Sequence, residues 1–277
     1  MSSRSLRLRL AVILTLLGAW VMTASIVMAT VTTSTYSGVI LADSPIAYWR
    51  MDEASGNLTD LVASRVLTAV GTPSYAQTGA ILPDTDTAIL FDGGTDKFTN
   101  TTLSPPLAAN NRTVEAWCRA TNTATKQGCA GWGDSGVVAD EYDMGFNTSK
   151  VYLQGDSRDT TGVTALSNDT WYHLAGTYDG TNVRLYVNGV LDVTTAQALD
   201  TTNTDGVHVG AFTSGYSAYL TGQVDEVAIY STVLTAAQIL SHYNNGVSSI
   251  RKVSGSSAIR KIAGLSMNVY KKIGGLA

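Results

Sequence analysis

The sequence predicts an all-β fold, a sandwich of antiparallel strands. The strongest observation is a pair of hairpin signals within residues 171–193. Asp179-Gly180 and Asn188-Gly189 tolerate the positive φ of tight turns, and runs rich in Val, Leu, Tyr and Thr flank each pair. Many other short apolar runs along the chain are separated by Gly, Asn, Asp and Thr. Such a succession favours a sandwich or jelly roll over alternating strands and helices.

The elements follow one another as short segments. Residues 36–43 form a short helix or an irregular lead-in, and Pro45 favours an extended chain before a first strand at 46–51. One helix is predicted near the end, capped by Thr235, with Gln238 at the reciprocal position of a capping box and Gly246 as its last residue. The other strands are expected at 88–91, 97–103, 113–119, 126–132, 142–146, 151–155, the three runs of 171–193, 207–212 and 223–230.

The 277 residues suit one large β domain with appendages. We assign 30–45 to a lead-in segment, 46–246 to the domain and 247–277 to a basic, repetitive tail. Residues 1–29 carry three arginines ahead of an uncharged apolar run at 10–29, which predicts a signal peptide cleaved after Ala29. A run of 20 residues is also long enough to span a bilayer, so an uncleaved membrane anchor is the alternative. Both alternatives predict export, with the protein secreted or on the cell surface.

Charge is divided between the body and the tail. Residues 30–247 hold 9 Lys and Arg against 22 Asp and Glu, a net charge of −13, whereas 248–277 hold 6 basic residues and no acid. An acidic body argues against nucleic acid as a partner, because phosphate binding needs concentrated positive charge. The tail repeats IRKVSG, IRKIAG and YKKIGG. This pattern indicates either a segment that contacts an anionic surface or polymer, or a solvated tail.

Only two cysteines occur, Cys118 and Cys129. They lie in the predicted strands 113–119 and 126–132, which a short polar segment suited to a hairpin separates. In an exported protein this arrangement predicts a cross-strand disulfide, which would add about 2–3 kcal/mol. Two small, buried, free thiols are the alternative.

Four segments together resemble the laminin G-like jelly rolls of the concanavalin A-like lectin and glucanase superfamily. These segments are AYWRMDEASG at 47–56, TVEAW at 113–117, WYHLAGTYDGTNVRLYVNG at 171–189 and GQVDEVAIYSTVLTAAQILSHY at 222–243. The resemblance covers about 200 residues, and four matches in order are more specific than any single motif. It implies two curved antiparallel sheets with the first and last strands close together, and a module that binds carbohydrate or a surface protein.

Catalysis is not expected. Retaining glucanases of this superfamily carry carboxylates at alternate positions of one strand, about 5–5.5 Å apart. The nearest match is Glu141-Tyr142-Asp143-Met144-Gly145, which lacks the second glutamate. Asp225 and Glu226 are adjacent and are therefore expected on opposite faces of a strand. The three histidines have no zinc-ligand spacing, and His173 is expected to make a structural hydrogen bond.

Candidate binding residues follow from the resemblance and from residue chemistry. Related jelly rolls hold calcium, which prefers carboxylate and carbonyl oxygens, so Asp225 with Asp52 or Asp60 are candidate ligands, and Asp96 is a separate candidate. Aspartates that cap backbone amides are the alternative for each. Aromatic faces beside polar groups suit sugars, and the candidates for ligand contact are Trp132, Tyr142, Tyr216 and Tyr219.

Two functional classes stay open. The first is an exported carbohydrate-binding or adhesion module. The second is a structural or host-recognition component of a virion or surface assembly, in which the jelly roll contacts protein. A degenerate glycoside hydrolase is a third and weaker candidate, because the fold alone does not choose between these roles.

Overall fold

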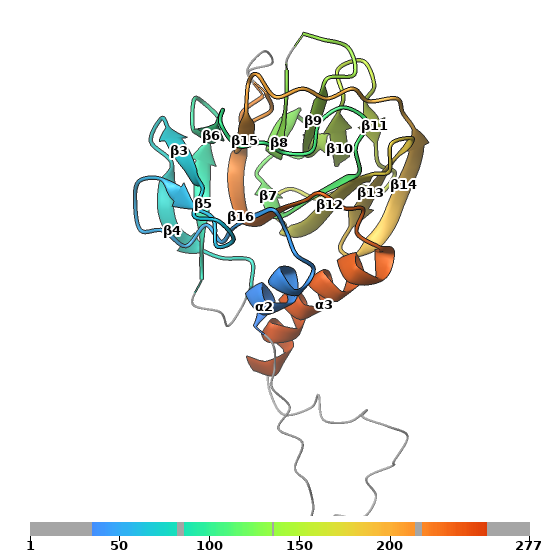
Figure 1. The fold of residues 1–277 in the computed structure, drawn as a ribbon. Helices are drawn as coiled ribbons and strands as arrows, with labels where there is room; N and C mark the ends of the chain where they lie inside the picture. The colour runs from blue at the N-terminus through green and yellow to red at the C-terminus, as the bar shows by residue number, and fades with distance from the viewer. Residues whose placement is uncertain (1–34, 82–85, 135, 214–217, 254–277) are drawn as a thin grey trace, which may run out of the picture. The chain divides into compact units, whose positions relative to one another are not determined.

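A computed structural model describes residues 35–81, 86–134, 136–213 and 218–253. These residues form two antiparallel sheets of 8 strands each, and two helices lie beside the first sheet (Figure 1). The first sheet has the order β14 (Val190–Ala196), β13 (Asn182–Val187), β12 (Tyr172–Tyr178), β7 (Arg112–Ala120), β16 (Thr221–Tyr230), β5 (Thr87–Asp92) and β4 (Ser74–Thr78), with β1 (Ala47–Trp49) also paired to β16. The second has the order β11 (Thr160–Thr161), β10 (Lys150–Gln154), β9 (Glu141–Asn147), β8 (Gln127–Gly133), β15 (Val207–Val209), β6 (Lys97–Asn100), β3 (Val66–Val70) and β2 (Leu58–Thr59).

The main core lies between the two sheets. Alternate side chains of each strand point inward, as they must in a pleated strand. The largest of these side chains have no exposed surface, and they include Trp49, Phe91, Trp132, Tyr142 and Phe146. The pairing of β1 with β16 confirms that the first and last strands are neighbours. The predicted all-β sandwich is therefore confirmed, although the sequence did not indicate the short strands β2, β3, β4 and β11.

The three-stranded meander β12–β13–β14 is confirmed. At its second turn Asn188 has φ of 52° and Gly189 has φ of 78°, as a two-residue turn of the hairpin type requires. At its first turn the Asp179 carboxylate accepts hydrogen bonds from the backbone N–H of Thr181 and Asn182. Both predicted turns are therefore present, and each depends on the residues of the turn itself.

The hairpin expected between residues 113–119 and 126–132 is wrong. These residues form β7 and β8, which belong to different sheets and do not pair with each other. The polar segment between them crosses from one sheet to the other. Cys118 and Cys129 consequently both face the core, one from each sheet, and both are free thiols in this structure.

Two helices cover the outer face of the first sheet. Helix α2 (Tyr36–Ala42) confirms the short lead-in helix, and the Thr35 hydroxyl caps it by accepting from the N–H of Gly38. The predicted capping box of α3 (Ala236–Val253) is also present, because the Thr235 N–H donates to Gln238 Oε1 and the Gln238 N–H donates back to the Thr235 hydroxyl.

Gly246 does not end α3, contrary to the prediction. The helix continues for seven residues to Val253. A Cβ at Gly246 would lie 2.5 Å from the ring of Trp117 and 2.9 Å from Ile81. This glycine therefore allows the helix to approach the sheet closely, and it is not a C-cap.

The predicted segment 1–29 and the tail from residue 254 onward lie outside the described residues. Among the residues that the structure describes, neither helix is long and apolar enough to span a membrane.

Candidate functional site

A concavity of about 600 Å³ lies where four separate segments meet. Its wall comes mainly from the loop between β6 and β7, and the end of β16 and the residues before β1 and β3 complete it. Polar groups and proline rings are mixed in the lining: Ile46, Arg65, Ser104, Pro105, Pro106, Ala109, Asn110, Asn111 and Ser231. This volume is typical of a small-ligand site, and its amides, hydroxyls and guanidinium suit a ligand rich in hydroxyl groups.

The loop that forms this concavity is held from inside the protein. Trp132 lies in the core, and its Nε1 donates to the carbonyl of Pro106 at 3.1 Å. Arg112 is buried, and its Nε donates to the Asn110 carbonyl at 2.9 Å while Nη2 donates to the Ala108 carbonyl. The side chains of Asn110 and Asn111 remain exposed. The backbone of the loop is thus preorganised, which lowers the entropy lost on binding a ligand.

Three buried acids form a second candidate site, a metal centre. Ligand oxygens of Asp86, Asp225 and Glu226 all lie within 4.8 Å of one another. A β-bulge between Asp225 and Ala228 makes this possible, and Glu226 has φ of 53° there. The expectation that Asp225 and Glu226 lie on opposite faces is therefore wrong, because a bulge breaks the alternation of side chains.

The chemistry of this cluster suits a hard cation. Asp225 Oδ2 accepts the N–H of Ala80 at 2.7 Å, whereas its Oδ1 is buried without a hydrogen-bond partner. Arg50 Nη2 lies 2.7 Å from Asp86 and 3.3 Å from Glu226. Burial, and then the charge of the neighbouring acid, raise the pKa of both Asp225 and Glu226 well above their ordinary values. Three acids against one arginine leave an excess of negative charge that a divalent cation or shared protons can neutralise.

Only one of the four predicted metal ligands, Asp225, belongs to this cluster. The Asp60 carboxylate accepts the N–H groups of Val62, Ala63 and Arg65, and Asp96 accepts the N–H of Thr72 at 2.6 Å. Both aspartates therefore cap backbone amides, the alternative considered for them, and Asp52 is exposed. Asp86 and Glu226 were missed because no local motif marks Asp86 and because strand alternation argued against Glu226.

A carboxyl pair lies on the outer face of the second sheet. Glu141 and Asp143 alternate along β9 and point away from the core, and neither has exposed surface. The Thr213 hydroxyl contacts both carboxyl groups, at 2.8 Å from Asp143, and Gln154 donates to Glu141. One hydroxyl hydrogen cannot serve two carboxylates. Accordingly burial, and then the charge of Glu141, raise the pKa of Asp143 to about 8.

We expect Asp143→Asn to remove a pH dependence of stability. The pKa of Asp143 is raised in the folded state, so its contribution is complete below the unfolded value near 3.8 and is lost as the pH rises through about 8. An asparagine cannot ionise, so the melting temperature at pH 9 should rise by about 3–6 °C. Thermal unfolding followed by circular dichroism at pH 5 and pH 9 measures this. A variant with the same alkaline loss as the parent protein would contradict the assignment, and the exposed Asp200→Asn is the control.

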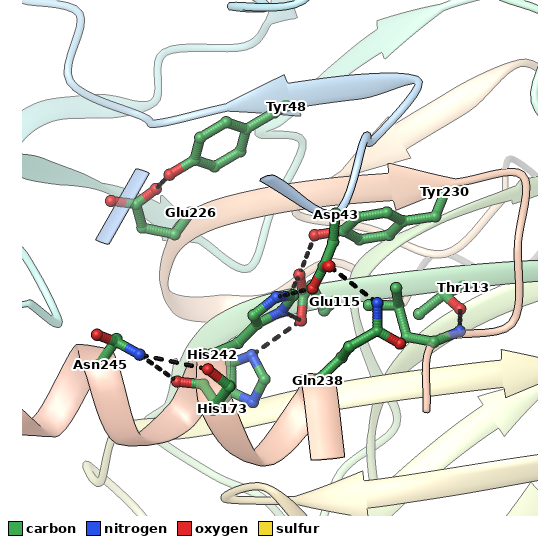
Figure 2. Close-up of polar contacts among 12 residues, drawn as sticks. Asp43, Tyr48, Thr113, Glu115, His173, Glu226, Tyr230, Gln238, His242 and Asn245 are labelled. Carbon is green, nitrogen blue, oxygen red and sulfur yellow. Dashed lines mark hydrogen bonds and ion pairs between the residues drawn. The ribbon is translucent and has the colours of Figure 1, made fainter. Parts of the chain in front are cut away.

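A buried carboxylate joins the helices to the first sheet (Figure 2). Glu115 on β7 lies 3.0 Å from His242 Nδ1 on α3 and 3.2 Å from His173 Nε2 on β12, and Tyr230 Oη donates to it. Asp43, at the end of α2, lies 2.8 Å from His242 Nε2. His173 is buried in this network, where its Nε2 contacts Glu115 as an ion-pair partner.

The predicted sugar-contact residues are dispersed. Trp132 and Tyr142 lie in the core with no exposed surface, so neither ring faces solvent. Tyr216 lies outside the described residues. Tyr219 is half-buried and pairs with Ala211 in an isolated bridge. Trp132 instead holds the loop of the concavity in place, because its Nε1 donates to the Pro106 carbonyl. A turn signal in the sequence, Asn110-Asn111 after Pro105-Pro106, was the available indication of this loop.

Cys118 and Cys129 lie against each other across the core. Burial raises the pKa of the Cys118 thiol well above its ordinary value, and a side-chain hydrogen bond with Cys129 raises it further. The pairing of these two residues in an oxidised form remains a prediction, now as a bond between sheets rather than within a hairpin.

Comparisons with known proteins agree with this architecture. No curated protein sequence matches the chain. Domain 4 of the extracellular arabinanase AbnA from Geobacillus stearothermophilus, solved with arabinotriose, is 18% identical with a TM-score of 0.54, and the match covers 71% of this chain and 97% of that domain. A structure of botulinum neurotoxin type C, whose cell entry depends on two ganglioside molecules, is 15% identical with a TM-score of 0.51, covering 74% of this chain. The binding domain of Paraclostridial Mosquitocidal Protein 1 is 12% identical with a TM-score of 0.52 and the same coverage. The chain matches 52% of each of these two toxin structures.

These structural neighbours share the fold, and a family model matches the sequence itself. It covers residues 92–240, which is more than half of the chain and includes β7 to β16 and the start of α3. The bulged strand with Asp225 and Glu226 and the loop that forms the concavity both lie within this span. The chain therefore belongs to the concanavalin A-like lectin/glucanases superfamily.

Proposed function

We propose that the chain is an exported, non-catalytic binding module that recognises carbohydrate through the concavity at residues 104–111. The observation that carries this proposal is the preorganised, open and polar lining, with Asn110 and Asn111 presented on a backbone that Arg112 and Trp132 hold from below. Amide side chains are both donors and acceptors, which suits neighbouring sugar hydroxyls. The half-buried ring of Pro106 offers an apolar face for the sugar ring.

Three further points support a carbohydrate ligand and export. Domain 4 of the arabinanase was solved with arabinotriose, and neurotoxin type C depends on gangliosides. The arabinanase is extracellular, in agreement with the apolar segment at 10–29. The acidic body also argues against polyanions as partners of this surface.

The carboxyl pair on β9 supports the proposed lack of catalysis. Glu141 and Asp143 share the Thr213 hydroxyl and are fully buried, and a glycine occupies position 145. A retaining glycosidase needs two carboxyl groups that flank an accessible glycosidic bond. Two buried acids that share one hydroxyl partner do not meet this requirement.

Calorimetric titration with arabinotriose and with a ganglioside oligosaccharide tests the proposed site. We expect saturable binding of at least one probe. Asn110→Ala combined with Asn111→Ala should weaken that binding by about 10–100-fold, as the loss of two hydrogen bonds implies. The melting temperature should not change, because the backbone contacts of the loop remain.

Asn244→Ala is the matched control, because this asparagine is exposed on α3 and lies outside the concavity. Unchanged binding by the double variant would overturn the concavity as the site. Absence of saturable binding to any glycan tested, together with self-association in sedimentation experiments, would instead favour a structural component of a virion or surface assembly.

We also propose that Asp86, Asp225 and Glu226 hold a structural calcium ion. The unpartnered Asp225 Oδ1 and the close carboxylate oxygens support this proposal. Calcium prefers oxygen ligands and accepts a variable number of them. The excess negative charge of the three acids around Arg50 would stabilise the bound ion. The ion would tie the loop before β5 to the bulge of β16, so its role would be structural.

A further inference from the structure

The concavity at residues 104–111 holds one cationic side chain and no acidic one. Arg65 is half-buried in its lining, and none of the other lining residues is an aspartate or a glutamate. This composition contrasts with the body of the protein, in which residues 30–247 carry 22 acids against 9 basic residues. Arg65 is therefore the single charged side chain that a ligand in this concavity would meet.

The guanidinium of Arg65 has a backbone partner but no acid partner. Its Nη1 donates to the carbonyl of Ile46, and among the residues that the structure describes no carboxylate forms an ion pair with it. By contrast, Arg50, Arg119 and Arg184 each pair with an acid. An arginine carries five N–H donors and stays protonated. The positive charge of Arg65 and its other donors can therefore bond a ligand.

The nearest acid along the chain does not compete for this charge. Asp60 is only 2% exposed, and its carboxylate accepts the backbone N–H groups of Val62, Ala63 and Arg65. These bonds fix the turn that places Arg65 just before β3. Because both oxygens of Asp60 are occupied by backbone amides, the Arg65 side chain is left to pair with an external anion.

The position of Arg65 in the concavity is fixed by the first and last strands. The Ile46 N–H donates to the carbonyl of Ile229 at 2.7 Å, and the Ile46 carbonyl accepts from Arg65. The exposed amides of Asn110 and Asn111 come from another part of the lining, the loop between β6 and β7. A sugar in the concavity would thus meet amide groups from the loop and a fixed cation from the strands.

We propose that the concavity recognises an acidic sugar, with Arg65 pairing with the sugar carboxylate while Asn110 and Asn111 bond its hydroxyl groups. This inference rests on the proposed carbohydrate function and names the class of sugar. The planar guanidinium matches a carboxylate with two parallel, charge-assisted hydrogen bonds. A densely charged polyanion does not fit, because one arginine neutralises one charge and the acidic body repels the others. The expected ligand is an oligosaccharide with an isolated carboxylate.

Calorimetric titration of the full chain with matched acid and ester probes tests this inference. The probes are sialyllactose and glucuronyl-xylobiose, which have a single carboxylate, and the methyl ester of each, which has nearly the same shape but no charge. We expect at least one acid to bind at least about tenfold more tightly than its ester, since hydrogen bonds to charged groups are the stronger kind.

Substitutions of Arg65 assign the preference to this side chain. Arg65→Gln should bind acid and ester with equal affinity. Arg65→Lys keeps the charge but not the planar fork, so it should keep a smaller preference for the acid. Arg158→Gln removes an exposed arginine outside the lining and should leave the preference intact. Near-ultraviolet circular dichroism verifies that each variant is folded.

Three results would overturn the inference. They are the absence of any preference for acid over ester in the parent protein, a preference that survives Arg65→Gln, and an equal loss of acidic and neutral sugars in Arg65→Gln. The last result would mean that Arg65 only holds the concavity together. Arabinotriose has no carboxylate, so its binding, and the loss of that binding in the Asn110→Ala and Asn111→Ala double variant, test the proposed function separately.

Discussion

Replacing Glu115 by leucine is expected to lower the free energy of unfolding by about 3–5 kcal/mol. The carboxylate is buried and accepts hydrogen bonds from Tyr230 and His242, and His173 Nε2 lies 3.2 Å from it as an ion-pair partner. A leucine leaves three buried polar groups without a partner, and hydrogen bonds to a charged acceptor are the stronger kind. Urea unfolding followed by tryptophan fluorescence measures the change.

The same network predicts how stability depends on pH. Burial alone would raise the pKa of Glu115, but the bonds from His173 and His242 reverse this and hold it well below its usual value. Burial alone would lower the pKa of His242, but the contacts with Glu115 and Asp43 raise it. The Glu115 contribution is present above pH 4.5 and is lost as the pH falls below it, whereas the His242 contribution is complete below pH 6.5 and is lost as the pH rises. Stability from this network is therefore greatest between about pH 4.5 and 6.5.

Two variants separate charge from packing in this experiment. Glu115→Gln keeps the shape and one acceptor oxygen, so it should lose less stability than leucine and should flatten the pH dependence. Glu53→Leu removes a carboxylate that is not fully buried and should lose much less. A leucine variant as stable as the parent protein would refute the role of Glu115 in holding α3.

Arg50→Met should be the second most damaging change, and calcium should counteract it. Arg50 bonds Asp86 and Glu226, which are both buried beside Asp225. Without the guanidinium, three buried acids face one another, and the expected loss in the presence of a chelator is about 3–5 kcal/mol. Calcium at about 1 mM should restore part of this loss, because a bound ion stabilises the folded state by mass action.

Melting temperatures of both proteins with calcium and with EDTA test the metal centre. Calcium should stabilise the parent protein and should stabilise Arg50→Met more, because the arginine no longer offsets the acids. Arg158→Met, at an exposed position, is the control for loss of a basic residue. If neither protein responds to calcium or EDTA, the acids share protons rather than a metal. If Arg50→Met is as stable as the parent protein in EDTA, the cluster does not depend on the arginine.

Much of the fold could be predicted because the sequence patterns that indicate its turns and helix ends span only a few residues. The turn residues of β12–β13–β14 and the capping box at Thr235 act within a few residues of one another, and the structure has both. The short lead-in helix also follows from a local cap at Thr35. The polar concavity was less predictable, because Ile46, Arg65, Asn110 and Ser231 come from four segments that only folding brings together.

The sequence by itself determined the all-β class, the register of the meander, the start of α3 and the opposite charges of body and tail, since these depend on local chemistry or on composition. Tertiary structure alone decided that β7 and β8 enter different sheets, because the choice of strand partner depends on burial across the whole core. It also decided that a bulge turns Glu226 toward Asp86 and that Gly246 packs on Trp117 inside a continuing helix. These contacts join residues more than one hundred positions apart, so no local pattern records them.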